Sequence, residues 1–271
     1  MSMTSRTLNM MMRRNSPQLL TYDIAAGVTA FSTMRHGGVG EGEYSEFNIN
    51  SFCGDSSESV SANKRLLAES IGIDSSHIIL PHQVHGTEFR IIGPEFLQMP
   101  ENVRNMILDG IDGVLTSVKG LCIGVSTADC IPVVLYDFAN HAACAVHAGW
   151  RGTAGRIAQK AVAGMRAAFR SDPAGLKAVV GPGISLDSFE VGIEVYNQFA
   201  EAGFEMDAIA KFYDKWHIDL KECNRLQLVA AGVPENNICV SGIDTFTSED
   251  FFSARRQGIS SGRIYTAIML E

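Results

Sequence analysis

The stretch that decides the fold is residues 121–152, LCIGVSTADCIPVVLYDFANHAACAVHAGWRG. It contains three short apolar runs, at residues 121–125, 131–136 and 142–146, joined by segments that carry polar side chains. The runs are apolar throughout rather than alternating, which is typical of strands covered on both faces. Pro132 stands near the start of its run, where a missing N–H group is tolerated. We therefore expect this stretch to form part of a buried sheet.

The sequence on either side alternates between short apolar runs and longer helical patterns. Further strands are expected at residues 28–33, 78–80, 89–92, 113–115, 176–180, 238–240 and 263–270. Helices are expected at about residues 57–71, 153–169, 192–202 and 219–231. Ser57 or Ser59 would cap the first helix, and Gly232 would end the last. The mixed order predicts an α+β fold, with mixed β-sheets in the middle layers and helices outside.

The chain shows no internal repeat, low-complexity block or long linker, so a single catalytic domain is expected over residues 18–271. Residues 1–17 are interpreted as a flexible N-terminal tail, because they contain basic residues without the apolar segment of a signal peptide.

Composition narrows the classes of partner and the compartment. The chain has 271 residues, of which 46% are hydrophobic and 19% charged, and its formal net charge is −8. An acidic chain repels phosphate backbones, so nucleic acid is not expected as a partner. The sequence contains no run of about 18 apolar residues, so no membrane span is expected. The six cysteines are scattered, and three of them (Cys122, Cys144 and Cys239) lie in expected strands, which favours free thiols and a cytoplasmic protein.

Chemically reactive side chains gather where expected strands end. Asp129 and Cys130 lie in the bend between two apolar runs, His147 ends a third, and His85 lies in PHQVHG just after another. One thiolate and two imidazoles suit Zn²⁺, and three protein ligands leave a fourth position open, as in catalytic zinc sites. Spacing alone also permits a plain alternative, in which Cys130 is an ordinary strand cysteine and the histidines are hydrogen-bonded loop residues.

Seven motifs carry a resemblance to a known family. They are His85-Gly86, ADCIP (128–132), HAGWRGT (147–153), GPGI (181–184), FEVG (189–192), NRLQL (224–228) and FSARR (252–256). Together and in this order they resemble the peptidoglycan editing factor family. It is also called the polyphenol oxidase or multicopper-oxidase-domain family, and it includes a mammalian purine nucleoside enzyme. The resemblance runs from about residue 31 to the C-terminus.

The resemblance implies a zinc-containing enzyme with one mixed α/β domain. Implied activities are phosphorolysis of adenosine, inosine and methylthioadenosine, together with adenosine deamination. The family name also implies a link to peptidoglycan fidelity. The implied metal ligands are His85, Cys130 and His147, matched position by position. A multicopper cluster is not expected, because seven histidines without an H-x-H pair supply too few imidazoles.

Other residues are candidates for binding the purine nucleoside and phosphate. Arg35 matches a family loop and could hold phosphate or a ribose hydroxyl, although a solvated loop arginine is equally compatible. Asn48 could bond the nucleoside or form an Asx turn, and Arg151 is a further anion candidate. Asp129 is expected to act in catalysis by orienting a ligating histidine. His82 could shuttle protons or be an exposed loop histidine.

Two other functions stay open on the sequence. A metal-free cysteine hydrolase would use Cys130 as nucleophile and His147 as base, and would not need His85. A non-enzymatic editing protein would hold a metal ion without turning over a nucleoside. The preferred nucleoside and the oligomeric state are not determined by the sequence.

Overall fold

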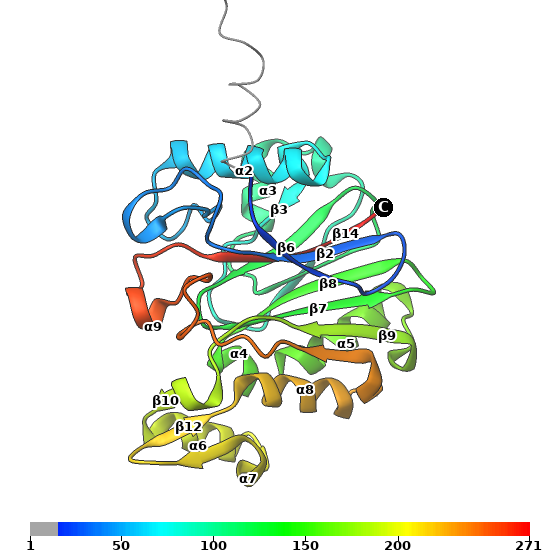
Figure 1. The fold of residues 1–271 in the computed structure, drawn as a ribbon. Helices are drawn as coiled ribbons and strands as arrows, with labels where there is room; N and C mark the ends of the chain where they lie inside the picture. Colours follow the sequence, from blue (N-terminus) through cyan, green and yellow to red (C-terminus); the bar gives the residue numbers. More distant parts are fainter. Residues whose placement is uncertain (1–15) are drawn as a thin grey trace, which may run out of the picture.

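The computed structural model describes residues 16–271, and most of the expected N-terminal tail therefore lies outside the described residues. Four layers follow one another in Figure 1: helix α2, a first sheet containing β2, β6 and β14, a second sheet containing β7, β8 and β9, and helices α5 and α8. The expected α+β fold, with mixed sheets inside and helices outside, is confirmed.

The two central sheets contain most of the strands. The first has the order β1-β2-β14-β6-β3 and the second β13-β9-β7-β8-β5-β4. Their strands are β1 (Leu19–Tyr22), β2 (Val28–Thr33), β3 (Ile78–Ile79), β4 (Phe89–Ile91), β5 (Gly113–Thr116), β6 (Cys122–Thr127), β7 (Ile131–Asp137), β8 (Ala142–Ala148), β9 (Leu176–Val180), β13 (Ile238–Val240) and β14 (Ile264–Leu270). A small third sheet, β10-β12-β11, consists of β10 (Glu190–Val191), β11 (Ala210–Phe212) and β12 (Trp216–Ile218).

The described chain has eight helices, of which α2 covers the outer face of the first sheet and α5 and α8 cover that of the second (Figure 1). The eight helices are α2 (Ser57–Ile71), α3 (Glu101–Ile107), α4 (Trp150–Ala154), α5 (Ile157–Phe169), α6 (Ile193–Glu201), α7 (Met206–Ile209), α8 (Leu220–Ala230) and α9 (Ala254–Gln257). The small sheet and helices α6 and α7 form a projecting lobe beside α4 and α8 (Figure 1). No helix within residues 16–271 is both long enough and apolar enough to cross a membrane.

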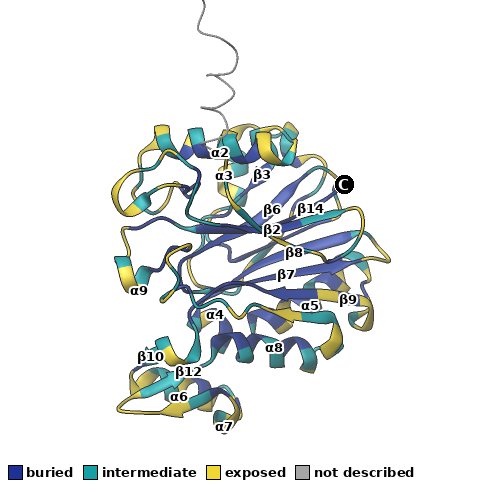
Figure 2. Cartoon of the chain, viewed as in Figure 1, coloured by how far each residue is buried: buried dark blue, intermediate teal, exposed yellow. Residues whose placement is uncertain are grey.

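Three hydrophobic clusters hold these layers together. One packs Leu67 of α2 against Phe31 and Tyr265 of the first sheet. A second lies between the two sheets, and the third packs the second sheet against α5 and α8. Strands β5, β6, β7 and β8 are buried along their whole length, as their continuous apolar runs predict (Figure 2).

Several local expectations need correction. The helix expected over 153–169 is two helices, because Arg156 adopts a left-handed conformation (φ 63°) between α4 and α5. The guanidinium of Arg156 lies over the ring of Phe204 and donates to the Ala202 carbonyl, so tertiary contacts override helix propensity. Ser56, rather than Ser57 or Ser59, caps α2 by accepting from the Ser59 N–H.

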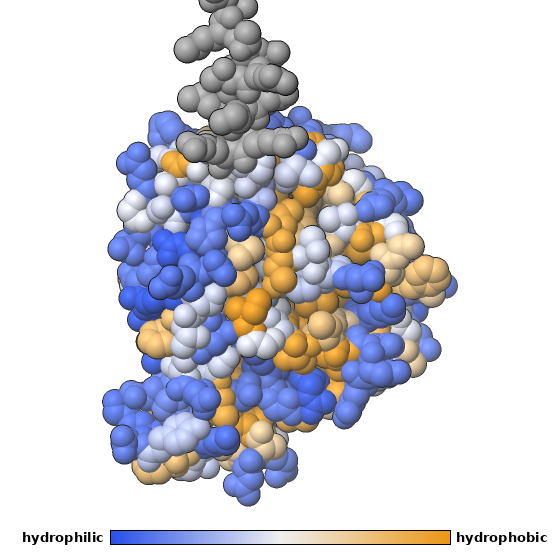
Figure 3. All heavy atoms as spheres, viewed as in Figure 1, coloured by the Kyte–Doolittle hydropathy of each residue, from blue (hydrophilic) through white to orange (hydrophobic). Residues whose placement is uncertain are grey.

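The surface carries both apolar and hydrophilic residues. On the face shown in Figure 3, apolar residues form an interrupted band over the layered sheets, and the projecting lobe is mostly hydrophilic. All six cysteines are free; Cys122 and Cys144 are buried in their strands, whereas Cys239 is exposed on β13.

Candidate metal centre

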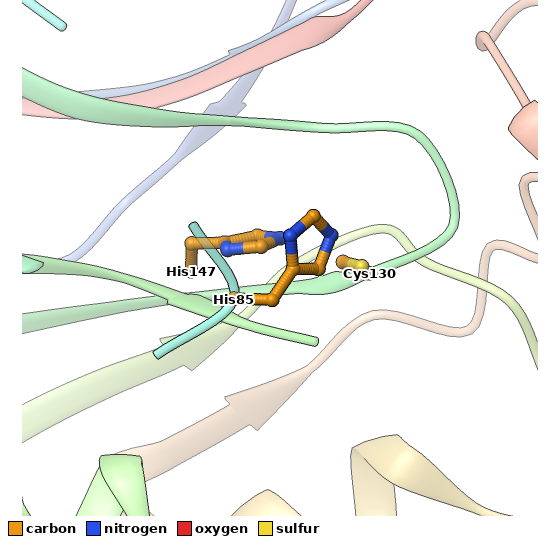
Figure 4. Close-up of side chains that lie close together, drawn as sticks. All are labelled: His85, Cys130 and His147. Carbon is orange, nitrogen blue, oxygen red and sulfur yellow. The ribbon is translucent and has the colours of Figure 1, made fainter. Parts of the chain in front are cut away.

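Three chain segments far apart in the sequence bring His85, Cys130 and His147 together. His147 lies near the end of β8, Cys130 immediately precedes β7, and His85 lies in the loop between β3 and β4. Strands β7 and β8 are antiparallel neighbours, with Pro132 opposite His147, so Cys130 and His147 meet at one end of the pair. The side chains converge in Figure 4, and their ligand atoms all lie within 4.8 Å of one another.

Two residues at this site have left-handed backbones. His85 has φ 61° and Asp129, next to Cys130, has φ 83°. Non-glycine residues adopt this region at a cost in free energy, and such strain concentrates at functional sites.

Asp112, just before β5, holds the two histidines in place. Its carboxylate lies 2.7 Å from Nδ1 of His147 and accepts from the backbone N–H groups of His85 (2.9 Å) and Gly86 (2.6 Å). Asp112 is fully buried. A carboxylate that accepts from Nδ1 fixes the ring orientation and leaves Nε2 free for a metal ion. Asp112 was not among the candidates from the sequence.

The charges at the site favour a thiolate. Burial raises the pKa of the Cys130 thiol, but the charge of His147 and hydrogen bonds from His147 and His85 outweigh burial and lower the pKa overall. The pKa of His147 moves the other way. Burial, the largest single effect, lowers it, but the combined effects of the Cys130 thiolate and the Asp112 carboxylate outweigh burial and raise it. Thiolate is the form of cysteine that binds metals or acts as a nucleophile.

The space among the three side chains fits a metal ion. A Cβ added at Gly149 would lie 3.0 Å from Cδ2 of His85 and 3.1 Å from Sγ of Cys130, so glycine keeps the centre of the group open. One thiolate and two imidazoles are the donor set of open catalytic zinc sites. Residues 16–271 contain no other cluster of three potential ligands. His85, Cys130 and His147 could therefore hold one metal ion.

The three residues line a cavity of about 590 Å³, a size typical of small-molecule sites. Phe52 and His82 form part of its wall, with their rings stacked 4.4 Å apart. Nδ1 of His82 lies 2.7 Å from the Asp109 carboxylate. Arg255, from α9, brings a positive charge to the lining.

Asp129 has contacts different from those expected. Its carboxylate accepts from the Thr245 hydroxyl (2.8 Å) and from the Arg255 backbone N–H (2.7 Å), and Asp112 contacts the histidine in its place. Asp129 thus connects the Cys130 segment to α9, which carries Arg255 toward the cavity.

The three residues expected to bind substrate lie outside the lining of this cavity. Arg35 donates to the Ser45 carbonyl and lies over the ring of Phe252. Asn48 is fully buried and its side chain accepts from the Asn50 N–H, as in an Asx turn. Arg151 lies over the ring of Trp150. Their roles in substrate binding stay predictions.

Comparison with known proteins places this fold and site in a family. The profile of the family described as multi-copper polyphenol oxidoreductase laccase matches residues 29–271, and the chain belongs to this family. The resemblance seen in the sequence motifs is thereby confirmed.

Relatives of this chain carry names of nucleoside enzymes. A protein named purine nucleoside phosphorylase, from Bacteroides thetaiotaomicron, is 41% identical over 250 residues, covering 91% of this chain and 93% of the relative. A protein named adenosine deaminase RL5, from an unknown prokaryotic organism, is 40% identical over 247 residues. The aligned region covers 89% of this chain and 94% of that protein. The solved structure of YlmD from Geobacillus stearothermophilus has a TM-score of 0.84 at 30% identity, covering 91% and 93% of the two chains.

Proposed function

We propose that this protein is a zinc-dependent enzyme acting on purine nucleosides, by phosphorolysis of adenosine, inosine and methylthioadenosine and by deamination of adenosine. The observation that carries the proposal is the meeting of His85, Cys130 and His147 in the lining of a ligand-sized cavity. The names of the relatives at 41% and 40% identity supply the substrate class.

The donor set favours zinc over a copper cluster. Within the described residues a single group of three ligands is found, and a multicopper centre needs several such groups of imidazoles. In an open three-ligand site zinc supplies Lewis acidity and activates water near neutral pH. The chain supplies orientation, because Asp112 fixes His147 and the segment that carries His85.

We assign recognition of the nucleoside to the walls of the cavity. The stacked rings of Phe52 and His82 offer a flat aromatic surface on which a purine base could stack. Arg255 and Arg263 both line the cavity. We assign phosphate to Arg255, because its guanidinium donates only to the Glu190 carbonyl, whereas most donors of Arg263 are engaged by carbonyl groups of residues 259–262. A loss of phosphate affinity in Arg35→Gln or Arg151→Gln would favour those residues.

His82 is the group that we assign to proton transfer in deamination. Asp109 accepts from Nδ1 of His82, which leaves Nε2 able to accept a proton at the cavity and to return it to the leaving amine. In phosphorolysis the attack of phosphate on the ribose needs positioning and charge stabilisation, which Arg255 can provide.

The proposal is tested by incubating the protein with adenosine and phosphate and separating the products by chromatography. Adenine with ribose 1-phosphate demonstrates phosphorolysis, and inosine demonstrates deamination. We expect His85→Ala to lose both turnover and bound zinc. His77→Ala is the matched control, because His77 bonds the Gly120 carbonyl away from the cavity. Absence of either product, in protein that contains stoichiometric zinc, would instead favour a non-enzymatic metal-binding editing protein.

A second function has one specific observation in its favour. A cysteine hydrolase requires a thiol, an imidazole and a carboxylate in contact. Here the Cys130 thiol contacts His147, which in turn contacts Asp112, and the pKa of the thiol is lowered. Such an enzyme needs no metal and no His85. Hydrolytic activity that survives His85→Ala and chelation would select this alternative over the zinc enzyme.

A further inference from the structure

A second cavity lies behind one wall of the first. It has a volume of about 760 Å³ and opens between α2 and α3, next to β3. Phe52 and His82 line both cavities, so their stacked rings separate the two. The candidate metal ligands do not line the second cavity, and the proposed nucleoside chemistry gives it no role.

Two cations line this cavity without forming an ion pair within 4.0 Å in the described chain. Lys64 projects from α2 and Arg104 from α3, and neither side chain forms an ion pair or hydrogen bond with any residue in 16–271. Nε of Arg104 is buried without a partner. Burial and the nearby charge of Arg104 lower the pKa of Lys64. Two partly buried, unpaired cations cost free energy that a bound anion would offset.

Three carboxylates lie near these cations, and within the described residues none of them forms an ion pair with Lys64 or Arg104. Asp109 lines the cavity but bonds His82, and Asp74 accepts from the Ser76 backbone N–H. Glu101 remains, and it forms no ion pair within 4.0 Å in the described chain. Neither Lys64 nor Arg104 is therefore paired directly with a carboxylate, and the buried Nε of Arg104 still lacks a hydrogen-bond partner.

The rest of the lining indicates the shape of a ligand. Ser61 and Ser75 also line the cavity, and their hydroxyl groups could donate to oxyanion oxygens. Apolar side chains such as Ile79, Phe96 and Leu108 form much of the remaining wall. A ligand that fits both parts has an oxyanion at one end and an apolar body at the other.

We propose that this second cavity is a binding site for a small amphipathic oxyanion, a phosphate monoester or carboxylate with an apolar group, whose anionic end is held by Lys64 and Arg104. The site is separate from the proposed metal centre, and ligand binding here does not require zinc or turnover.

The test uses phenyl phosphate, benzoate and inorganic phosphate as probes, titrated into the whole protein by calorimetry. We expect saturable binding of phenyl phosphate or benzoate that is roughly tenfold or more tighter than binding of inorganic phosphate, because the apolar wall contributes. Tighter binding of phenyl phosphate identifies a phosphate ligand, and tighter binding of benzoate identifies a carboxylate; both results support the proposal.

Substitutions test which residues form the binding site. Lys64→Gln and Arg104→Gln should each weaken binding roughly tenfold or more, since each removes a charge-assisted hydrogen bond, and Lys64→Arg should retain it. Arg65→Gln is the matched control, because Arg65 is exposed on the same helix and does not line the cavity. Arg255→Gln removes the cation assigned to phosphate in the first cavity, so the binding that remains in this variant reports the second cavity. Circular dichroism verifies that each variant is folded.

Three results would overturn the proposal. The first is no saturable binding of phenyl phosphate or benzoate. The second is saturable binding that disappears in Arg255→Gln, or that depends on Arg65 as strongly as on Lys64. The third is binding weakened by only one of the two replacements at Lys64 and Arg104, which would exclude a site formed by both cations.

Discussion

Asp112 is joined to His147 twice: its carboxylate lies 2.7 Å from Nδ1 of the ring, and its carbonyl accepts from the His147 backbone N–H at 2.8 Å. The same carboxylate accepts from the backbone of His85 and Gly86. One buried side chain therefore sets the positions of two of the three candidate ligands. Its replacement should weaken metal binding in a protein that still folds.

Asp112→Asn should lower zinc affinity roughly 10–100-fold, as expected for loss of a carboxylate that orients a ligating histidine. The amide has nearly the same shape but carries a weaker acceptor and no charge. Zinc affinity is measured by competition with a chromophoric chelator. Asp109→Asn is the control, because Asp109 pairs with His82 rather than with a ligand. Equal zinc affinity in wild type and Asp112→Asn would contradict the assigned role.

Gly149→Ala should reduce zinc binding roughly tenfold or more while the protein stays folded, because ligand positions must be kept within a few tenths of an ångström. The backbone of Gly149 has φ −66°, which alanine adopts freely, so the expected effect is steric. The added methyl group would lie 3.1 Å from Sγ of Cys130.

Zinc content by mass spectrometry and the thermal midpoint check this result. The control is Gly164→Ala in α5, where the new Cβ would meet Cδ2 of Leu115 at an ordinary 3.5 Å. Full zinc content in Gly149→Ala would show that the open centre of the group has no part in metal binding.

The sequence predicts the central strands well, because burial on both faces leaves a continuous apolar run. Strand β2 has the expected bounds, and β7 and β8 extend the expected runs by one or two residues. The small sheet was missed because β10, β11 and β12 have only two or three residues each, too few for a periodic pattern.

Candidate ligands could be predicted from the family motifs, but Asp112 could not. It faces His147 only because β5 pairs antiparallel with β8, with Gly113 opposite Val146, and spacing along the chain does not reveal that register. Asp129 was favoured because it adjoins Cys130 in the sequence. Its left-handed backbone and its bonds to Thr245 and Arg255 arise from tertiary contacts that local sequence does not encode.

Asp129→Asn should destabilise the protein by about 1–3 kcal/mol, because an amide cannot replace both hydrogen bonds of the buried carboxylate. Asparagine also tolerates the left-handed backbone, so strain does not add to the loss. Urea denaturation measures the change, and zinc content should stay full. Asp187→Asn is the control: this exposed carboxylate accepts from Tyr213, and its loss should cost less than about 0.5 kcal/mol. Loss of zinc from Asp129→Asn would instead support the histidine-orienting role expected from the sequence.

His82→Gln should lower the turnover of adenosine deamination roughly 100-fold, in the range expected for removal of a general acid–base group, and leave zinc content unchanged. Asp109→Asn should cause a smaller fall, because it releases Nδ1 of His82 but keeps the imidazole. The matched control is His36→Gln. His36 also forms a histidine–carboxylate pair, with Asp250 at 3.0 Å, but does not line the cavity. Inosine formation is followed at saturating adenosine, so that weaker stacking of the base on Phe52 affects KM and not the measured rate. Full turnover in His82→Gln would assign the proton transfer to another group of the cavity.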